Sequence, residues 1–266
     1  MTVAAADRAA PGFVGGRPLG RVLGALREAR HYRALGNMLR RYPHPADALA
    51  RYLFGRGRYP ARVTVRTPAG PVHPRLYSQH DMLTLNEVFC RLDYELAGPA
   101  RVVVDLGSNI GLSALYFLTL PSRPFCYLYE PDPRNVARLR NNLEAYTDHY
   151  ALAEAAVGPC AGRVRFATEA TGRYGRVEGG AGTGITVDCL AVNDVLERAL
   201  ARTGTIDLVK IDTEGLELDT VRAMDPALLR RVRAIAVEAE PAGPVHPALF
   251  TQRQYGSVCR LTRHGG

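Results

Sequence analysis

The sequence of 266 residues has few cysteines and no long apolar run. Its five cysteines are scattered and form no C-x-x-C pair, which argues against a zinc ribbon or a disulfide scaffold and favours a reducing cytoplasm. No apolar stretch approaches the roughly 20 residues that a membrane span needs. The N-terminus lacks the charged segment and following apolar stretch of a signal peptide. These absences predict a cytoplasmic α/β domain of ordinary size, preceded by an extension.

Lysine is almost absent as well. Lys210 is the only lysine among 34 Lys and Arg residues, and it lies in an apolar run two residues before Asp212. Residues 1–60 hold eleven arginines and three acidic residues, so the formal net charge of +8 belongs to this segment. Such a basic arm could contact nucleic acid, an anionic membrane or an acidic partner, and a solvated arginine-rich helix face is the simpler alternative.

Apolar runs and amphipathic stretches alternate along most of the chain. The pattern predicts strands over 101–106, 125–130, 151–158, 206–211 and 234–239, and helices over 81–96, 190–200 and 216–229. Such alternation is typical of a doubly wound, mostly parallel, Rossmann-like sheet with helices on both faces. We expect residues 81–266 to form this domain and residues 1–80 to form a partly helical extension with a short strand. Residues 171–184 are glycine-rich and predict a loop, either a lid or a disordered crossing.

The turn after the first predicted strand carries a distinctive motif, Asp105-Leu-Gly-Ser-Asn-Ile-Gly111. Gly107 would let the chain turn sharply, Gly111 would let the next helix begin close to a ligand, and the helix N-terminus would suit a carboxylate. The spacing is not the G-x-G-x-x-G of dinucleotide-binding proteins, which argues against NAD. An acidic residue before the first glycine suits a cation, such as the ammonium of S-adenosylmethionine (SAM). Glu130, at the end of the second strand, could accept hydrogen bonds from ribose hydroxyls.

Four segments together resemble a known family: VVVDLGSNIG, YLYEPDPRNVARLRNNL, IDLVKIDTEGLELDTV and IAVEAEP. Their order is similar to that of the FkbM-type methyltransferases, over roughly residues 81–241. The resemblance implies a class I SAM-dependent methyltransferase, usually an O-methyltransferase. It also implies that SAM is bound by Asp105, Gly107, Ser108, Asn109, Gly111 and Glu130, with Ala156 and Val157 near the adenine. One departure from the family pattern is Glu240, where members often carry histidine or another residue.

The lysine and its neighbouring acids are the candidate catalytic residues. Asp212 follows the strand 206–211, where an acceptor would meet SAM, and Lys210 shares its parity, so both side chains could point to one face. Asp212 is expected to position the acceptor hydroxyl or to take its proton, with Glu238 nearby at the tip of the next strand. Lys210 could act directly if burial lowered its pKa, or it could pair with a neighbouring acid.

Two further groupings are weaker. Asp212, Glu238 and His246 could ligate a divalent metal, but their spacing is too loose to be a signature, so no metal site is predicted. His80 and Asp81 could reach the site, or Asp81 could simply cap the helix that follows it.

The sequence therefore predicts a SAM-dependent methyltransferase that acts on a hydroxyl of a small molecule, such as a natural product or a sugar-bearing metabolite. RNA methylation through the basic arm is an alternative, but the K-D-K-E tetrad of such enzymes needs two lysines. The N/D-P-P-Y/F stretch of adenine or cytosine methyltransferases is absent from the sequence. A non-catalytic SAM-binding scaffold is another alternative, and homodimer formation is left open.

Overall fold

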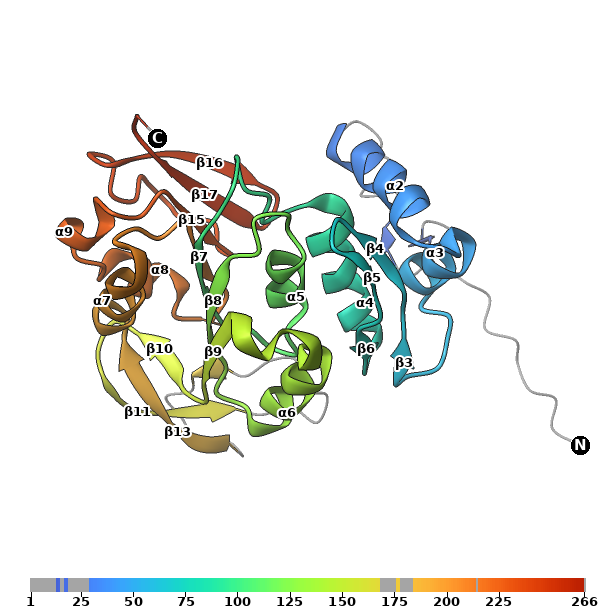
Figure 1. The fold of residues 1–266 in the computed structure, drawn as a ribbon, viewed down its shortest axis with the longest axis horizontal. Helices are drawn as coiled ribbons and strands as arrows, with labels where there is room; N and C mark the ends of the chain where they lie inside the picture. The colour runs from blue at the N-terminus through green and yellow to red at the C-terminus, as the bar shows by residue number, and fades with distance from the viewer. Residues whose placement is uncertain are drawn as a thin grey trace, which may run out of the picture.

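The computed structural model describes residues 13–14, 17–18, 29–167, 176–177, 184–213 and 215–265. Its centre is a seven-stranded sheet in the order β16-β17-β15-β14-β7-β8-β9 (Figure 1). The strands are β7 (Val102–Leu106), β8 (Phe125–Tyr129), β9 (Tyr150–Ala153), β14 (Leu208–Ile211), β15 (Ala234–Val237), β16 (Phe250–Tyr255) and β17 (Val258–Arg263). Strands β15, β14, β7, β8 and β9 run parallel, whereas β17 is antiparallel to β15 and to β16. The mostly parallel, Rossmann-like fold is confirmed.

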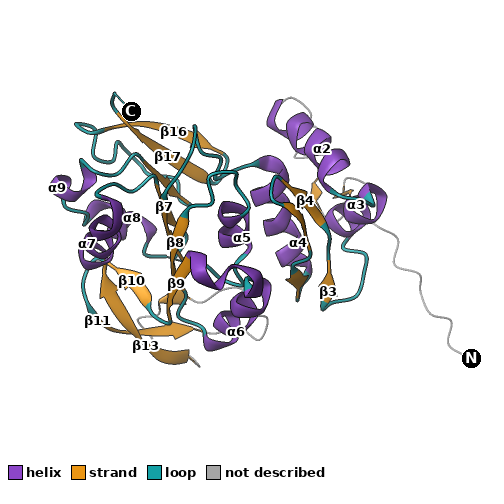
Figure 2. Ribbon diagram, in the orientation of Figure 1, coloured by secondary structure: helices purple, strands orange, loops and turns teal. Residues whose placement is uncertain are grey.

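Helices cover both faces of this sheet (Figure 2). They are α5 (Leu112–Leu118), α6 (Pro133–Asn142), α7 (Val192–Thr203), α8 (Glu217–Arg222) and α9 (Pro226–Leu229). Alternate residues of each strand supply two separate cores, as the two-residue period of a strand requires. Val103 and Leu208 pack towards α5 and α6. Val104 and Val209 pack towards α7, α8 and α9. Both faces are apolar, which is why these strands are continuous hydrophobic runs in the sequence.

The order of the strands reverses between β7 and β14. From β7 the chain proceeds to β8 and β9 on one side, then returns to β14 and β15 on the other. In open α/β sheets, ligands bind outside the carboxyl ends of the strands at such a switch point. The motif after β7 and the residues after β14 therefore meet where a ligand is expected.

The N-terminal segment packs against the same core as α5. It contains α2 (Ala29–Arg41), α3 (Pro45–Phe54) and short strands β1 (Phe13–Val14), β2 (Arg17–Pro18), β3 (Ala61–Arg62), β4 (Val65–Thr67), β5 (Gly70–Val72) and β6 (Arg75–Leu76). Met38, Tyr42 and Leu76 belong to the cluster that also holds Leu115 and Val103. The division at residue 80 stays a prediction, and part of the predicted extension, including residues 19–28, lies outside the described residues.

Three predicted elements were wrong in extent. The helix over 81–96 is α4 (Gln79–Asn86) followed by a π-helical turn, η1 (Glu87–Arg91), which ends at Leu92 in a left-handed conformation (φ 62°). The helix over 216–229 is two helices, because Asp225 and Pro226 cap and begin a new one, α9.

The third case is the strand over 151–158, which is β9 and β10 (Ala156–Gly158). Strand β10 leaves the main sheet and pairs with β13 (Gly184–Ala191) in a second sheet that also holds β11 (Gly162–Ala167) and β12 (Arg176–Val177). Most of the glycine-rich stretch 171–184 lies outside the described residues. Across the helices that the structure describes, none is both long and apolar enough to cross a membrane.

Candidate active site

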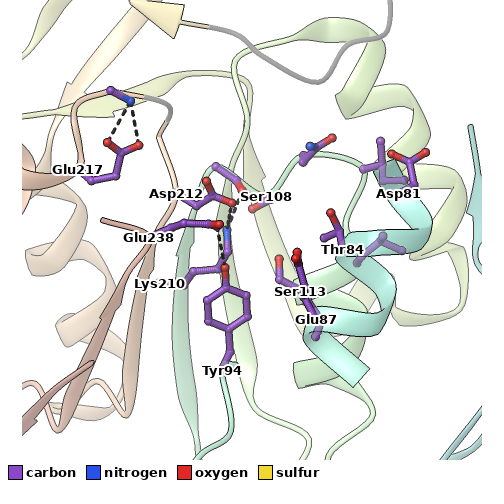
Figure 3. Close-up of a pocket in the computed structure, with 16 residues that line it drawn as sticks. Asp81, Thr84, Glu87, Tyr94, Ser108, Ser113, Lys210, Asp212, Glu217 and Glu238 are labelled. Atoms are coloured by element: carbon purple, nitrogen blue, oxygen red, sulfur yellow. Dashed lines mark hydrogen bonds and ion pairs between the residues drawn. The ribbon is translucent and has the colours of Figure 1, made fainter. Parts of the chain in front are cut away.

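A cavity of about 330 Å³ opens at the carboxyl ends of β7, β14 and β15 (Figure 3). One wall is formed by the ends of these strands and the loops that follow them. The opposite wall is formed by α4 and η1, which contribute Asp81, Thr84, Glu87 and Val88. The predicted residues that line it are Gly107, Ser108, Asn109, Lys210, Asp212 and Glu238. Its volume is in the range of about 300–1,000 Å³ that is usual for small-molecule sites.

Glycine is required at position 107 for two reasons. Gly107 has φ +79°, a conformation that residues with a side chain rarely adopt, and a Cβ there would lie 1.8 Å from the backbone oxygen of Asp212. The loop after β7 is thus pressed against the loop after β14. Gly111 also has a positive φ, but a Cβ there would meet the Leu139 side chain at 3.0 Å. Glycine at position 111 therefore allows close packing of α5 on α6, and its closeness to a ligand stays a prediction.

Lys210 and Asp105 face each other across the switch point. They are register partners on the parallel strands β14 and β7. Lys210 Nζ lies 3.0 Å from Asp105 Oδ1 and donates a hydrogen bond to the Gly107 carbonyl at 2.9 Å. The second carboxylate oxygen of Asp105 accepts a hydrogen bond from Ser113 Oγ at 2.6 Å. The two side chains are 0% and 2% exposed, so this is a fully buried ion pair that also anchors the glycine loop.

The charge state of Lys210 follows from these contacts. Burial acts to lower the pKa of Lys210, but the negative charges of Asp105 and Asp212 outweigh it, and the net shift is upward. Lys210 therefore remains an ammonium, and the idea that burial would free it to act as a base was wrong. Burial raises the pKa of Asp105, and Lys210 and Ser113 oppose that shift. The cation beside Asp105 is the protein's own lysine, so a direct contact between Asp105 and a ligand stays a prediction that this geometry does not support.

The cavity side of Lys210 carries two more acids. Asp212 Oδ2 lies 3.4 Å from Lys210 Nζ, and the Asp212 side chain is 29% exposed. The shared orientation of Lys210 and Asp212 is therefore confirmed. Burial, and then repulsion from Asp212, raises the pKa of Glu238 to about 8. The partly exposed Asp212 carboxylate thus lies beside the Lys210 ammonium and the Glu238 carboxyl group, which can be protonated. Glu214, the other acid of this turn, lies outside the described residues.

Glu130 follows β8 and holds the glycine loop after the neighbouring strand β7 by a hydrogen bond. Its Oε2 accepts the backbone N–H of Asn109 at 2.8 Å, while Oε1 accepts that of Asp132 at 2.9 Å. It is 4% exposed and is not among the residues that line the described cavity. Burial raises its pKa to about 7, although these hydrogen bonds oppose the shift. Its adjacency to the glycine loop matches the sequence expectation, and its contact with ribose stays a prediction.

The two residues expected near the adenine of SAM belong to the second, smaller sheet. Ala156 and Val157 are buried in β10, and their proximity to adenine stays a prediction.

His246 does not join Asp212 and Glu238 in the alternative metal site, because its ring nitrogen Nε2 is hydrogen-bonded to the Val221 carbonyl at 2.7 Å. Throughout the described ranges no group of three or more His, Cys, Asp or Glu residues could hold a metal ion, so this alternative ligand set is wrong.

Sequence reasoning missed the α4–η1 wall and Tyr94. The helix cap is Ser78, not Asp81: Ser78 Oγ accepts the Asp81 N–H, and Asp81 Oδ2 accepts the Ser78 N–H. The S-x-x-D spacing was a readable signal for this reciprocal cap. Asp81 nevertheless lines the cavity, as the alternative reading allowed. Tyr94 comes from the connection before β7, and nothing in its sequence context marks it.

Comparison with known proteins decides the family. The sequence profile described as the methyltransferase FkbM domain matches residues 105–255, which is more than half of the chain. The chain belongs to the FkbM methyltransferase family. Membership of this family implies SAM as the methyl donor, and the predicted resemblance is confirmed. The matched range begins at Asp105, the first residue of the glycine motif, and ends in β16.

Individual relatives are more distant. The 2-O-methyltransferase NoeI of Sinorhizobium fredii is 38% identical over 71 residues, which is 27% of this chain and 29% of NoeI. This chain thus matches under a third of that curated relative. An rRNA methylase from Streptococcus thermophilus is 11% identical, with a TM-score of 0.36, over 65% of this chain and 91% of that one. An O-methyltransferase family protein from Burkholderia thailandensis is 13% identical, with a TM-score of 0.36, over 71% and 60%. Structural similarity this low says nothing about the acceptor.

The cavity of this FkbM methyltransferase suits a cationic cofactor. Five carboxyl groups line it, those of Asp81, Glu87, Asp212, Glu217 and Glu238. The single ammonium among the lining side chains, that of Lys210, is already paired with the buried Asp105. SAM, which the family implies, carries both a sulfonium and an ammonium. Clefts lined by one sign of charge concentrate ligands of the opposite sign, so the lining fits SAM.

Proposed function

We propose that this enzyme transfers the methyl group of SAM to a hydroxyl oxygen of a small-molecule acceptor, such as a natural product or a sugar-bearing metabolite. The observation that carries the proposal is the position of Asp212. Its carboxylate is at the switch point, lines the cavity, and is partly exposed, whereas its neighbours Asp105 and Lys210 are buried. An acceptor in the cavity can therefore reach Asp212, which is a group able to receive a proton.

Bound SAM would supply an electrophilic methyl group on a positively charged sulfur. Asp212 would take the proton of the acceptor hydroxyl, whose oxygen would receive the methyl group and leave S-adenosylhomocysteine as the second product. Lys210 holds Asp212 in place by charge, and alignment of this kind can supply several kcal/mol of the rate enhancement. Glu238 completes the acid cluster beside it. Gly107, Ser108, Asn109, Gly111 and Glu130 are assigned to the cofactor side.

A small acceptor is supported by the two facing walls of the site. The α4–η1 wall stands opposite the strand ends across a cavity of about 330 Å³, which is suited to a small polar molecule and leaves little room for a nucleic-acid duplex. The local similarity to NoeI, whose name describes a 2-O-methyltransferase, is consistent with an oxygen as the methyl acceptor.

Calorimetric titration with SAM and with NAD tests the cofactor first. We expect SAM to bind and NAD not to bind, and folded protein that binds no SAM would overturn the assignment. SAM labelled in its methyl group is then offered with three sets of acceptors: hydroxylated small molecules including saccharides, the matching amines, and structured RNA. Label in a methyl ether, identified by mass spectrometry and NMR, supports the proposal. Label in RNA or on nitrogen contradicts it, and binding without any transfer would indicate a scaffold.

A further inference from the structure

Tyr94 contacts both Lys210 and Glu238, and all three residues line the cavity. It lies in the connection between η1 and β7, and it is only 5% exposed. Its hydroxyl donates a hydrogen bond to Glu238 Oε2 at 3.3 Å, and its ring centroid is 5.6 Å from Lys210 Nζ. Figure 3 shows the ring below these groups, with its hydroxyl end directed at them. The ring also packs against Phe117, with centroids 6.4 Å apart.

The hydroxyl acts as a donor at working pH. Burial raises the pKa of Tyr94 well above its ordinary value, and the nearby Asp212 and Glu238 add to that shift, so the phenol keeps its proton. A hydrogen bond donated to a carboxylate favours its charged form. Because Oε2 of Glu238 accepts from Tyr94, a proton carried by Glu238 is favoured on Oε1. Tyr94 thus determines which oxygen of Glu238 is available to the rest of the cluster.

The other groups around Glu238 come from three elements. Asp212, after β14, and Glu87, in η1, repel its negative charge, whereas Lys210, in β14, attracts it. Tyr94 is the uncharged contact in this set and adds a directed hydrogen bond. Glu238 also shares a side-chain hydrogen bond with Asp212, and the hydrogen bond from Tyr94 to Oε2 adds a second directional contact that fixes its orientation.

We propose that Tyr94 is a positioning residue for methyl transfer. Its hydroxyl fixes the Glu238 carboxyl group and its ring supports the Lys210 ammonium, and both of these residues lie beside the Asp212 carboxylate that faces the acceptor. The proposal rests on the proposed function for its role in turnover. The Tyr94–Glu238 coupling itself can be measured without any acceptor.

The variant Tyr94→Phe keeps the ring and its contacts with Lys210 and Phe117 and removes only the hydroxyl. Carbon-13 NMR of glutamate carboxyl carbons follows the titration of Glu238, whose signal is assigned by its loss in Glu238→Gln. One hydrogen bond is worth about 0.5–1.5 kcal/mol, so the midpoint should move to higher pH by roughly half to one unit. The matched control is Tyr116→Phe, which removes a hydroxyl from another buried tyrosine beside Phe117 that does not line the cavity.

An unchanged Glu238 midpoint in Tyr94→Phe, or an equal change in Tyr116→Phe, would overturn the proposal. Turnover supplies the second readout once a hydroxyl acceptor is known. We expect Tyr94→Phe to lower kcat about tenfold with the KM for SAM within about threefold, and to lower it no further when Glu238 is already glutamine. An equal loss in that background would show that Tyr94 acts independently of Glu238. A shifted midpoint in a protein that methylates no hydroxyl would overturn the proposed function, and with it the role of Tyr94 in transfer, while the contact itself would stand.

Discussion

The two sides of Lys210 differ although both present a carboxylate to the same ammonium. On the inner side, Asp105 is fully buried, 3.0 Å from the nitrogen, and also bonded to Ser113. On the cavity side, Asp212 is 3.4 Å away and 29% exposed. The inner aspartate has its partners within the protein, whereas the outer one can exchange a partner for a ligand. The comparison shows how one buried cation can pair with a fully buried acid and a partly exposed acid at once.

The same comparison accounts for a lysine in a chain whose other cations are all arginine. The ammonium contacts the Gly107 carbonyl, Asp105 and Asp212 from one compact centre inside the space between β7 and β14. A planar guanidinium carries its donors in a rigid fork and needs more room than this. Of the 33 arginines, 22 lie beyond residue 60, yet none takes this place, and the one lysine lies where three partners converge.

The largest effect is expected from removing the shared cation. Lys210→Met leaves Asp105 buried without its counter-ion, which typically costs about 3–5 kcal/mol of unfolding free energy. Urea unfolding followed by circular dichroism measures the loss. The matched control is Arg163→Met, which breaks the exposed pair with Asp188 and should change stability by less than about 1 kcal/mol. Equal losses in the two variants would contradict a special role for the buried pair.

The next largest effect is expected at Asp212, where a substitution should lower turnover but leave SAM binding nearly unchanged. Asp212→Asn removes the proposed proton acceptor and should lower turnover by at least about 10²-fold, with SAM affinity within a few-fold. Steady-state kinetics and calorimetry test both parts. Asp219→Asn, an exposed aspartate of α8 outside the cavity, should leave turnover unchanged. Wild-type turnover in Asp212→Asn would dismiss the assigned role.

The contact between the two loops can be tested through the glycines. Gly107→Ala places a Cβ 1.8 Å from the Asp212 backbone oxygen in a left-handed conformation, so one of the two loops must move. We expect a loss of at least about 2 kcal/mol in unfolding free energy, together with weaker SAM binding. Gly111→Ala meets a leucine side chain at 3.0 Å instead, so its loss of stability should be smaller. The reverse ranking would show that the loops are not held together at Gly107.

A pH dependence should also distinguish the cavity side from the rest of the surface. The pKa of Glu238 is raised to about 8 in the folded protein, so its contribution to stability is present at pH 4 and is lost as the pH rises towards 8. Unfolding free energy should therefore fall between pH 5 and pH 8 and fall less steeply in Glu238→Gln. Glu240→Gln, which alters an exposed acid two residues away, should retain the wild-type slope. A steeper slope in Glu238→Gln would contradict this sign.

Much of the fold could be predicted because its signals are local. The runs that became β7, β8, β14 and β15 are short, mostly apolar and largely buried, and the cap at Asp132 and Pro133 stands directly in the sequence. The break at Pro226 was also visible, although a continuous helix had been predicted across it. Strand β10 was not predictable, because its departure from the main sheet depends on pairing with β13.

The site was predictable only in part, because several of its contacts join residues that are far apart in the sequence. Asp105, Lys210 and Asp212 could be placed near one edge because parallel strands end together. The direct pairing of Lys210 with Asp105 depends on a register between strands about a hundred residues apart. Tyr94 and the α4–η1 wall come from outside the strand ends, and no sequence period points them at the cavity.

The central claim is that SAM and its acceptor meet in the cavity beside Lys210. A crystal structure of the protein with S-adenosylhomocysteine, the product of methyl loss, tests it most directly. The account predicts that the sulfur lies within this cavity, on the side of Asp212, with the nucleoside running towards the loop at Gly107 and Asn109. A nucleoside bound elsewhere, with the space beside Asp212 filled by protein side chains, would contradict it.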